Sequence, residues 1–535
     1  MGLRRKTTFI LLALALVATA CASETADTTT TEAAPDATAA PGTTAAPTDT
    51  TAAPSAEGSV RFLIAENFWA DWDPYQHTAQ SQGRIEAQIF DYLVDFPGGD
   101  LSSPQPMLAT EWTQVDDSTW EFRLREGVTF HDGSTFDGED VKASIELSSG
   151  ATETPSLQAG NWIPTTVEVV DPLTVRLQSE SPFAALFAQL RNTIIVSAED
   201  LADNPEGIKT QPNGTGPFKL VTNDPTRKVM EANADYWQGA PQIAELVWEF
   251  IQDPDTRLSA LLAGQAHAID RVPPQHLQVV AGSPDFVLSS VTGIESVNLW
   301  VPPGRFPLWE ESPEFREAVM WSIDREALVT SLVQGESAVA TSFVPTETLY
   351  HTPGEPAYTR DAEQAAALLE QGGIADGGPE FELWVASGFL PRAEEVVSAI
   401  VANMEELGLK PRVVTSDLGG MIDDIFSEDG TGDMYHLSWS SNGDPTAHAR
   451  VYSSSFAWFF GDEELDELIA SVATTTDPAA REQVTVEMQA HLWDQLWHIP
   501  LYNSDFSIAH SASLEGLEVR PNFQTLFYPA RLASD

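Results

Sequence analysis

The sequence predicts an α/β fold, and three observations lead to that prediction. Segments with the two-residue alternation of half-buried strands interleave, along the whole body of the chain, with segments that have the 3.6-residue spacing of amphipathic helices. Of the 535 residues, 42% are hydrophobic, which is enough to fill large cores. The foldable part of the chain exceeds what one hydrophobic core usually serves, so we expect more than one core.

The strands are predicted from alternation and from short apolar runs. Residues 59–64 form a first run, Ser-Val-Arg-Phe-Leu-Ile. In residues 120–124 apolar side chains alternate with charged ones, which is typical of a strand with one buried face. We expect a further apolar strand at residues 434–437 and another at residues 410–414.

The helices are predicted from their end signals and their apolar faces. Ser312 and the proline after it suit an N-cap and a first turn, and Gly335 lies near the expected end of that helix. Residues 396–407 place their apolar side chains on one face and stop at Gly408. A third helix begins at Asp477-Pro478.

The first 21 residues have the features of a secretion signal. Basic residues at positions 4–6 precede an apolar run at residues 9–18, and the segment ends Ala18-Thr19-Ala20-Cys21. A signal that ends directly on a cysteine resembles a bacterial lipoprotein precursor. We therefore expect export and a lipid on Cys21 that anchors the chain to the outer face of the cell membrane. The alternative is an ordinary cleaved signal in which Cys21 has no special role.

Residues 22–58 predict a disordered linker. They are almost wholly Thr, Ala, Pro, Ser, Asp and Glu, with no aromatic residue and no Lys or Arg. Such a segment cannot bury enough apolar surface to offset the entropy of the chain. We expect it to hold the folded part away from the membrane surface.

Charge and cysteine content exclude several classes of protein. The formal net charge is -53, which argues against nucleic-acid binding, because phosphates require a basic face. The acidic residues are spread along the chain, which indicates a solvated, salt-adapted surface, with an acidic groove for cationic ligands as the alternative. Cys21 is the single cysteine, so packing must hold the exported fold without disulfides.

The most specific motifs begin at residue 106 and continue through the chain. They are Pro106-x-Leu108-Ala109-x-x-Trp112, Trp120-x-Phe122-x-Leu124-Arg125-x-Gly127-Val128-x-Phe130-His131-Asp132-Gly133, Gly214-Thr215-Gly216-Pro217-Phe218, Asn233-Ala234-Asp235-Tyr236-Trp237 and Ile323-Asp324-Arg325. This set resembles the signature of the extracellular solute-binding proteins that serve peptide, nickel and oligosaccharide ABC importers. We expect most of these residues, including His131 and Asp132, to be structural.

The resemblance implies a two-lobed, periplasmic-binding-protein-like fold of type II. The first lobe would comprise residues 59–290, with an extra subdomain at about residues 75–163. The second lobe would comprise residues 291–502, and residues 503–535 would return to the first lobe. The ligand would bind in the cleft between the lobes.

The resemblance also implies the ligand-binding residues. Trp439 would line the cavity, with Asn442 at the position where dipeptide binders carry an ammonium-binding Asp, and with Asp444 nearby as a substitute. The facing wall would consist of Glu66, Asn67, Phe68 and Trp69. Dipeptide binders also hold the ligand carboxylate with an Arg after the strand that ends near Val385. Ser387-Gly388 stands there instead, and Arg392 comes later.

These departures weaken the dipeptide hypothesis and favour longer oligopeptides. We expect the protein to be a monomer and its protein partners to be the ABC permease subunits. An oligosaccharide ligand stacked on Trp69 and Trp72 is one alternative, and a sensor lipoprotein without an importer is another. We expect no enzyme, because the usual nucleophile and zinc motifs are absent and Asp423-Asp424 reads as a solvated helix face. We expect no cofactor and no metal site, since the histidines lack ligand spacing.

Overall fold

The computed structural model describes most of the chain after residue 55. The described residues are 56, 58–65, 75, 80–100, 102–152, 154, 156–272, 274–333, 337–374, 377–427, 429–440, 442–454 and 461–533. The expected signal with Cys21, nearly all of the linker, and the predicted wall from Glu66 to Trp69 lie outside these residues.

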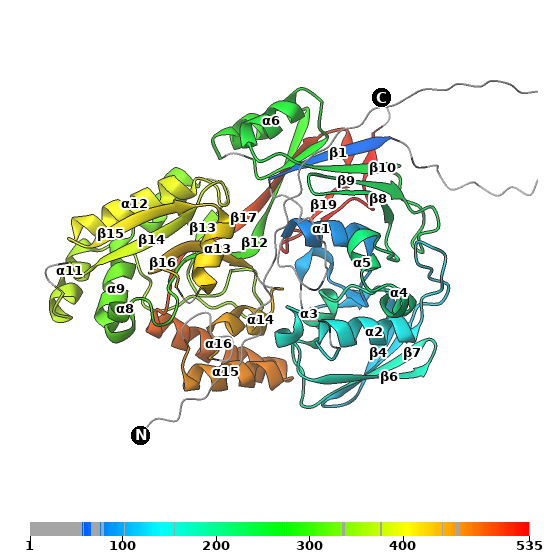
Figure 1. Cartoon of the computed structure of the whole chain (residues 1–535), viewed down its shortest axis with the longest axis horizontal. Coiled ribbons are helices and arrows are strands. Elements are labelled where there is room, and N and C mark those ends of the chain that lie inside the picture. Colours follow the sequence, from blue (N-terminus) through cyan, green and yellow to red (C-terminus); the bar gives the residue numbers. More distant parts are fainter. Residues whose placement is uncertain are drawn as a thin grey trace, which may run out of the picture. The chain divides into compact units, whose positions relative to one another are not determined.

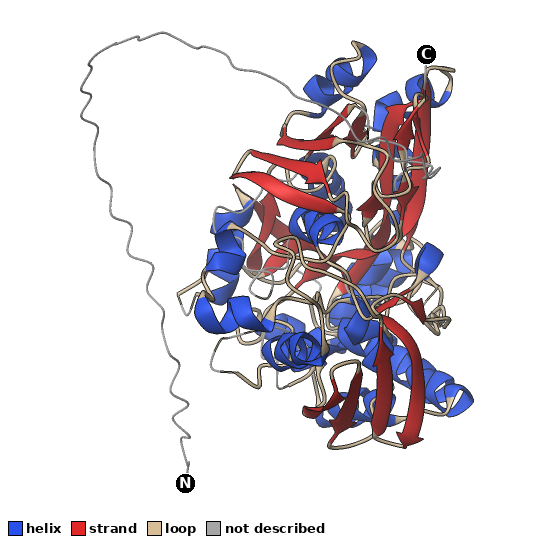
Figure 2. Cartoon of the chain, turned by 90° about the vertical axis from the view of Figure 1, so that its right-hand side faces the viewer, coloured by secondary structure: helices blue, strands red, loops and turns tan. Residues whose placement is uncertain are grey.

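Strands and helices alternate through the described residues, which confirms the α/β class (Figure 2). Eleven described strands form one mixed sheet, and ten of them follow a single path across it. In path order these are β15 (Lys410–Ser416), β14 (Glu380–Ala386), β16 (Met434–Ser440), β12 (Phe286–Trp300), β17 (Ile499–Ser511), β11 (Ala268–Asp270), β1 (Ser59–Ile64), β10 (Glu245–Phe250), β9 (Arg227–Ala232) and β8 (Phe218–Asp224). The eleventh, β13 (Ser337–Val339), pairs with β17.

Two long strands lie in the middle of this sheet and join its two halves. β12 and β17 pair antiparallel from Phe286↔Ser511 to Leu299↔Ile499, and they lie side by side in Figure 1. The register shifts between Thr292 and Glu295, so β12 is irregular near its middle. The same two strands therefore contribute to both halves of the sheet.

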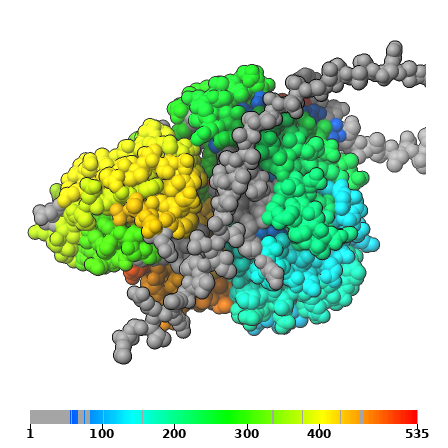
Figure 3. Space-filling view, in the orientation of Figure 1, coloured from blue at the N-terminus to red at the C-terminus, as the bar shows by residue number. Residues whose placement is uncertain are grey.

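The buried side chains form two groups of cores on either side of this irregularity. One core contains Val297, Leu299 and Tyr502 and includes residues only between 297 and 502. The other cores contain residues 60–280 together with residues 506–530. We propose that the two groups correspond to the two lobes. In Figure 3 the surface of the first group is mostly cyan and green, and that of the second is yellow and orange.

A separate four-stranded sheet belongs to the first group. Its order is β4 (Ala109–Asp116), β5 (Thr119–Leu124), β7 (Thr174–Ser179) and β6 (Thr165–Asp171), so it continues beyond the expected end of the extra subdomain at residue 163. Phe122 and Leu124 on β5 are buried, as the alternation predicts. Three short ladders complete the strands: β2 (Val94–Asp95) with β3 (Gln105–Pro106), β18 (Leu514–Glu515) with β21 (Arg531–Leu532), and β19 (Glu518–Val519) with β20 (Thr525–Leu526).

Helices pack on both groups. In the first they are α1 (Gln80–Ile89), α2 (Gly138–Ser148), α3 (Leu186–Arg191), α4 (Ala198–Asp203), α5 (Gly207–Thr210), α6 (Pro254–Leu262) and α7 (Leu277–Ala281). In the second they are α8 (Pro307–Glu311), α9 (Pro313–Ser322), α10 (Arg325–Ala327), α11 (Ala362–Gln371), α12 (Ala393–Glu406), α13 (Leu418–Phe426), α14 (Pro445–Ala449), α15 (Glu463–Thr474) and α16 (Pro478–Gln495). Among the residues described, no helix combines the length and apolarity needed to cross a membrane.

The helix predicted to begin after Ser312 is shorter than expected. Ser312 caps α9, but the helix ends at Ser322, because Ile323 is extended and Asp324 caps a new turn by accepting a bond from the Ala327 amide. The buried Arg325 then donates to the carbonyl oxygens of Ala340, Pro500 and Tyr358. The motif Ile323-Asp324-Arg325 is therefore a helix break that ties three segments together.

The prediction for Asp423-Asp424 is wrong for one of the two residues. Asp423 is exposed, but the Asp424 carboxylate accepts bonds from Arg305 and from the Tyr435 hydroxyl. These bonds, together with the Thr431 and Gly432 amides, lower the pKa of Asp424 although burial opposes them. The i,i+4 apolar pattern of α13 could not reveal a partner that comes from residue 305.

Candidate functional site

A row of polar side chains crosses the three strands at the point where the two groups of cores meet. Trp439 on β16 and Asn503 on β17 both pair with Ser296 on β12. Residues directly opposite each other in a sheet project to the same face, and so do residues two apart along a strand. Trp439, Ser296, Asn503 and Asp505 therefore share one face, which we call the crossover face.

Several polar atoms on the crossover face are buried without a partner. Within the described part of the chain, Trp439 Nε1, Asn503 Oδ1, Asp505 Oδ1 and Asn298 Oδ1 make no hydrogen bond. Asn298 lies two residues from Ser296 and is fully buried. Native proteins rarely leave buried polar groups unpaired, because such a group loses its hydrogen bonds to water and gains none in the protein. One indole donor and three acceptors on one face are suited to a polar ligand.

The negative charge on this face comes from Asp505. Burial is the main cause that raises the pKa of Asp505, and nearby Glu347 raises it further, while a bond with Thr292 opposes the shift. Asn503 Nδ2 donates to Thr346 Oγ1 at 2.9 Å, which places the segment containing Glu347 beside the face. Sequence reasoning missed Asn503 and Asp505, because a strand that returns from the C-terminus carries no local signal of its neighbours.

The loop after Trp439 is held by internal bonds. Asn442 is buried, and its Oδ1 accepts a bond from the Asp444 amide at 3.0 Å. Between them Gly443 has a φ of +82°, a conformation that favours glycine. The sequence-predicted residues Trp439 and Asn442 thus lie at the start of one tight turn.

Asp444 already has a charged partner. Its two carboxylate oxygens accept bonds from Arg481 Nη2 at 3.0 and 2.8 Å, and it also caps α14 through the Thr446 amide. Arg481 comes from α16 and donates through Nε to the Val472 carbonyl on α15. Asp444 therefore ties three helices together, and its predicted contact with a ligand stays a prediction.

Gly388, at the position expected to hold a ligand carboxylate, lies close to Gln252 from the other half of the sheet. Gly388 follows β14 with a φ of +71°, and a Cβ added there would lie 3.1 Å from the Gln252 amide nitrogen, which follows β10. Arg392 is used elsewhere, since its Nη1 donates to the Leu332 carbonyl. A small residue at 388 thus leaves room for a neutral amide, which the sequence alone did not indicate.

A second contact joins the two groups of cores. Arg450 Nη1 donates to Asn161 Oδ1 at 2.7 Å, and the Ala184 amide donates to the Ala473 carbonyl at 2.9 Å. Asn161 and Ala184 belong to the segments around the four-stranded sheet, whereas Arg450 and Ala473 belong to the second group. The contact therefore stabilises the arrangement in which the two groups approach each other.

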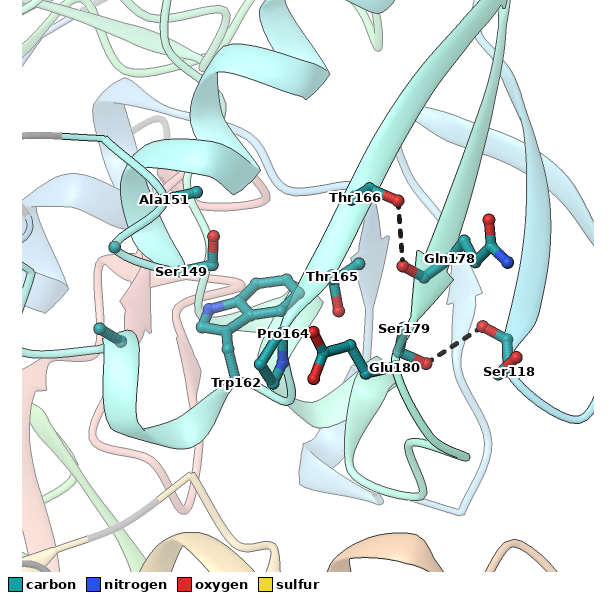
Figure 4. A pocket seen from close by; sticks show the side chains of 12 residues that line it. Ser118, Ser149, Ala151, Trp162, Pro164, Thr165, Thr166, Gln178, Ser179 and Glu180 are labelled. Carbon is teal, nitrogen blue, oxygen red and sulfur yellow. Dashed lines mark hydrogen bonds between the residues drawn. The ribbon is translucent and has the colours of Figure 1, made fainter.

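A pocket of about 660 Å³ lies beside the four-stranded sheet, away from the crossover face. Figure 4 shows Trp162 and Glu180 at this pocket with Thr166 and Ser179. Thr166 donates to the Gln178 carbonyl and Ser179 to the Ser118 carbonyl, so these hydroxyls are already bonded. Of the predicted ligand contacts that the structure describes, Trp439, Asn442 and Asp444 do not line it, and we place the candidate site at the crossover face.

His131 has the structural role that was expected. Its Nε2 lies 2.9 Å from the Gly216 carbonyl oxygen, and burial lowers its pKa to about 4. The neutral ring therefore joins two of the sequence motifs at neutral pH. Among the described residues, no group of three or more His, Cys, Asp or Glu side chains is arranged to hold a metal ion.

Comparisons with known proteins place this architecture in context. The profile described as "Bacterial extracellular solute-binding proteins, family 5 Middle" matches residues 103–459. The glutathione-binding protein GsiB of Salmonella typhi is 28% identical over 438 residues, which cover 78% of this chain and 84% of that protein.

Solved structures share the fold at lower identity. A dipeptide-binding protein of Pseudoalteromonas sp. SM9913, in complex with Met-Leu, superposes with a TM-score of 0.79 at 21% identity, covering 89% of this chain and 100% of the other. HbpA2 of Haemophilus parasuis gives a TM-score of 0.73 at 24% identity over the same shares. The two-lobed, type II binding-protein fold is thereby confirmed, as is the expectation of a binding protein that is not an enzyme.

Proposed function

Because this chain belongs to family 5 of the bacterial extracellular solute-binding proteins, we propose that it captures an oligopeptide between two lobes and delivers it to the permease of an ABC importer. The family binds solutes outside the cytoplasm and works with ABC permeases. The identity of the ligand and the lobe closure are our proposals.

The observation that carries the proposal is the set of unpaired polar atoms on the crossover face. Trp439 Nε1 can donate to a ligand carbonyl, and Asn503 Oδ1 and Asp505 Oδ1 can accept from amide or ammonium groups. A peptide main chain offers both kinds of group at regular spacing, and the indole face adds apolar area. The similarity to proteins named for glutathione and dipeptides supports this ligand class.

In the described residues no Lys or Arg bonds at Ser387-Gly388, where Ser387 instead donates to the Glu394 carboxylate, and this favours peptides longer than two residues. A dipeptide places its carboxylate close to its ammonium, so a cation near Gly388 would be needed to hold it. Gln252 offers only an amide there, and Arg392 is bonded to Leu332. In a longer peptide the same position meets a main-chain group, for which an amide is a suitable partner.

Native mass spectrometry of protein purified without unfolding, followed by calorimetry, tests this proposal. We expect a copurified oligopeptide, and we expect tri- to pentapeptide pools to bind more tightly than a pool of neutral oligosaccharides. Tight binding of the saccharide pool alone would replace the peptide assignment with the oligosaccharide alternative. Loss of peptide uptake on deletion of a neighbouring permease would separate an importer component from a sensor.

We further propose that a lipid on Cys21 anchors the mature chain and that residues 22–58 act as its tether. The variant Cys21→Ser should appear in the medium or remain unprocessed, while the parent protein partitions into detergent. Unchanged partitioning of the variant would refute the lipid anchor. Deletion of residues 22–58 should leave peptide affinity intact.

A further inference from the structure

We infer that Asp505 is the residue that receives a cationic group of the ligand, in place of the loop residues Asn442 and Asp444. The inference rests on the proposed function and narrows it to solutes with an ammonium group. It assigns a specificity-determining role to a residue on the returning strand β17.

The loop residues are poorly placed for this role. Asn442 carries no charge, and its Oδ1 accepts the Asp444 amide. Asp444 is 2% exposed, and both of its oxygens accept bonds from Arg481. A ligand ammonium at Asp444 would have to displace a buried guanidinium, which would leave that positive charge unpaired.

Asp505 has the opposite properties. It is half-buried, and in the described residues no Lys, Arg or His forms an ion pair with it. Its Oδ1 is shielded from solvent and has no hydrogen-bond partner there. A carboxylate in these surroundings gains more from an ammonium than a solvated one does, because water screens the pair less.

The groups around Asp505 also favour a cation. Thr292 lies opposite it on β12, and Glu347 approaches from the segment that Asn503 holds through Thr346. Glu347 is exposed and acidic, so it adds negative potential without competing for the same oxygen.

A second, independent feature points to a ligand at the same place. Asn503 is fully buried two residues before Asp505 on the same strand face, and its Oδ1 has no partner among the described residues. Trp439 shares the face and offers an indole ring and an unpaired N–H. An ammonium has several N–H donors and can therefore bond to more than one acceptor on this face.

Two ammonium sources share this chemistry, namely a peptide N-terminus and a lysine side chain. The probes trialanine, N-acetyl-trialanine, N-acetyl-Lys-Ala-Ala and maltotriose separate them. Trialanine carries an α-ammonium, N-acetyl-Lys-Ala-Ala carries only a side-chain ammonium, and the other two carry none. Calorimetry at pH 7 on the parent, Asp505→Asn and Glu347→Gln gives twelve comparable affinities.

We expect the parent to prefer one ammonium-bearing probe over N-acetyl-trialanine. Asp505→Asn should weaken binding of the preferred probe by about 10- to 100-fold, because a charge-assisted bond becomes a neutral one. It should leave N-acetyl-trialanine unchanged. The control Glu347→Gln should change affinity less than about fivefold and only at low salt, since an exposed charge is screened.

The outcomes distinguish this inference from the proposed function. Equal binding of the preferred probe by Asp505→Asn and the parent would overturn the role of Asp505 alone. A parent that binds N-acetyl-trialanine as tightly as both ammonium-bearing probes would also overturn it while supporting peptide capture. Binding of maltotriose alone would refute both.

The pH dependence of the parent provides a measurement that does not depend on the folding of a variant. Ammonium binding requires the ionised carboxylate, and burial raises the pKa of Asp505. Affinity for the preferred probe should therefore fall as pH is lowered through this raised pKa, at a higher pH than for an ordinary aspartate. Parallel pH profiles for the ammonium probe and N-acetyl-trialanine would contradict the assignment.

Discussion

Arg481 holds three helices of the second half of the chain together, and its replacement tests whether Asp444 is structural. The pair Asp444–Arg481 is almost completely buried, with side-chain exposures of 3% and 6%. Removing one partner of such a pair leaves an uncompensated buried charge, at a cost of about 3–5 kcal/mol. Arg481→Met also removes the bond to the Val472 carbonyl, so we expect a loss near the upper end of that range.

Urea unfolding of the parent, Arg481→Met, Asp444→Asn and the double variant measures this effect. The double variant should lose less stability than the sum of the two single losses, because each single change leaves the other partner unpaired. Arg531→Met is the matched control, since its pair with Glu515 is exposed and should contribute less than about 1 kcal/mol. An Arg481→Met variant as stable as Arg531→Met would refute the reasoning. Asp444→Asn that folds normally but loses ligand affinity would instead favour a ligand contact.

Four further predictions concern binding, closure, acid and salt. Trp439→Ala should weaken peptide binding by about 1–3 kcal/mol in calorimetry while leaving the melting temperature nearly unchanged, because the indole lies at the edge of its core. Arg450→Ala removes the bond to Asn161, so small-angle scattering should show a more open average form, and peptide affinity should fall about two- to tenfold; an unchanged scattering curve would contradict this. Burial lowers the pKa values of His436 and His448 to about 4, below the value of about 6.5 in the unfolded chain. The free energy of unfolding is therefore unaffected above pH 6.5 and falls by up to about 3 kcal/mol per ring as pH drops from 6.5 towards 4, because protonation favours the unfolded chain. His436→Leu should reduce this acid sensitivity in unfolding measurements. With a formal charge of -53, the protein should melt at a higher temperature in molar sodium chloride than at low salt, and a flat curve would indicate local compensation of the acids.

Local patterns in the sequence were sufficient for several elements. The alternation at Phe122 and Leu124 predicted β5, the Asp477-Pro478 signal predicted the start of α16, and the apolar face of residues 396–407 predicted α12. These elements are decided by neighbours within a few residues, through side-chain direction and capping bonds. The family and the two-lobed class could also be predicted from the sequence, because the motif residues stand at fixed spacing along the chain and can be recognised without knowledge of the fold.

The candidate site could be predicted only in part. The sequence indicated Trp439 and Asn442 because they stand at the end of an apolar strand and in a Gly-containing turn. It gave no reason to select Asn503 or Asp505, which reach the crossover face only because β17 pairs with β12 across about 200 residues of chain. It also assigned Asp424 to solvent, since nothing near residue 424 reveals Arg305.

The sequence by itself was sufficient to predict the α/β class, the helices and strands with clear local signals, and the family to which the chain belongs. The tertiary structure alone decided which charges are paired. Asp444 is neutralised by Arg481 from a distant helix, whereas Asp505 is half-buried with an acidic neighbour and no ion-pair partner among the described residues. Pairing and desolvation depend on distances between segments remote in sequence, and these distances exist only after the chain has folded.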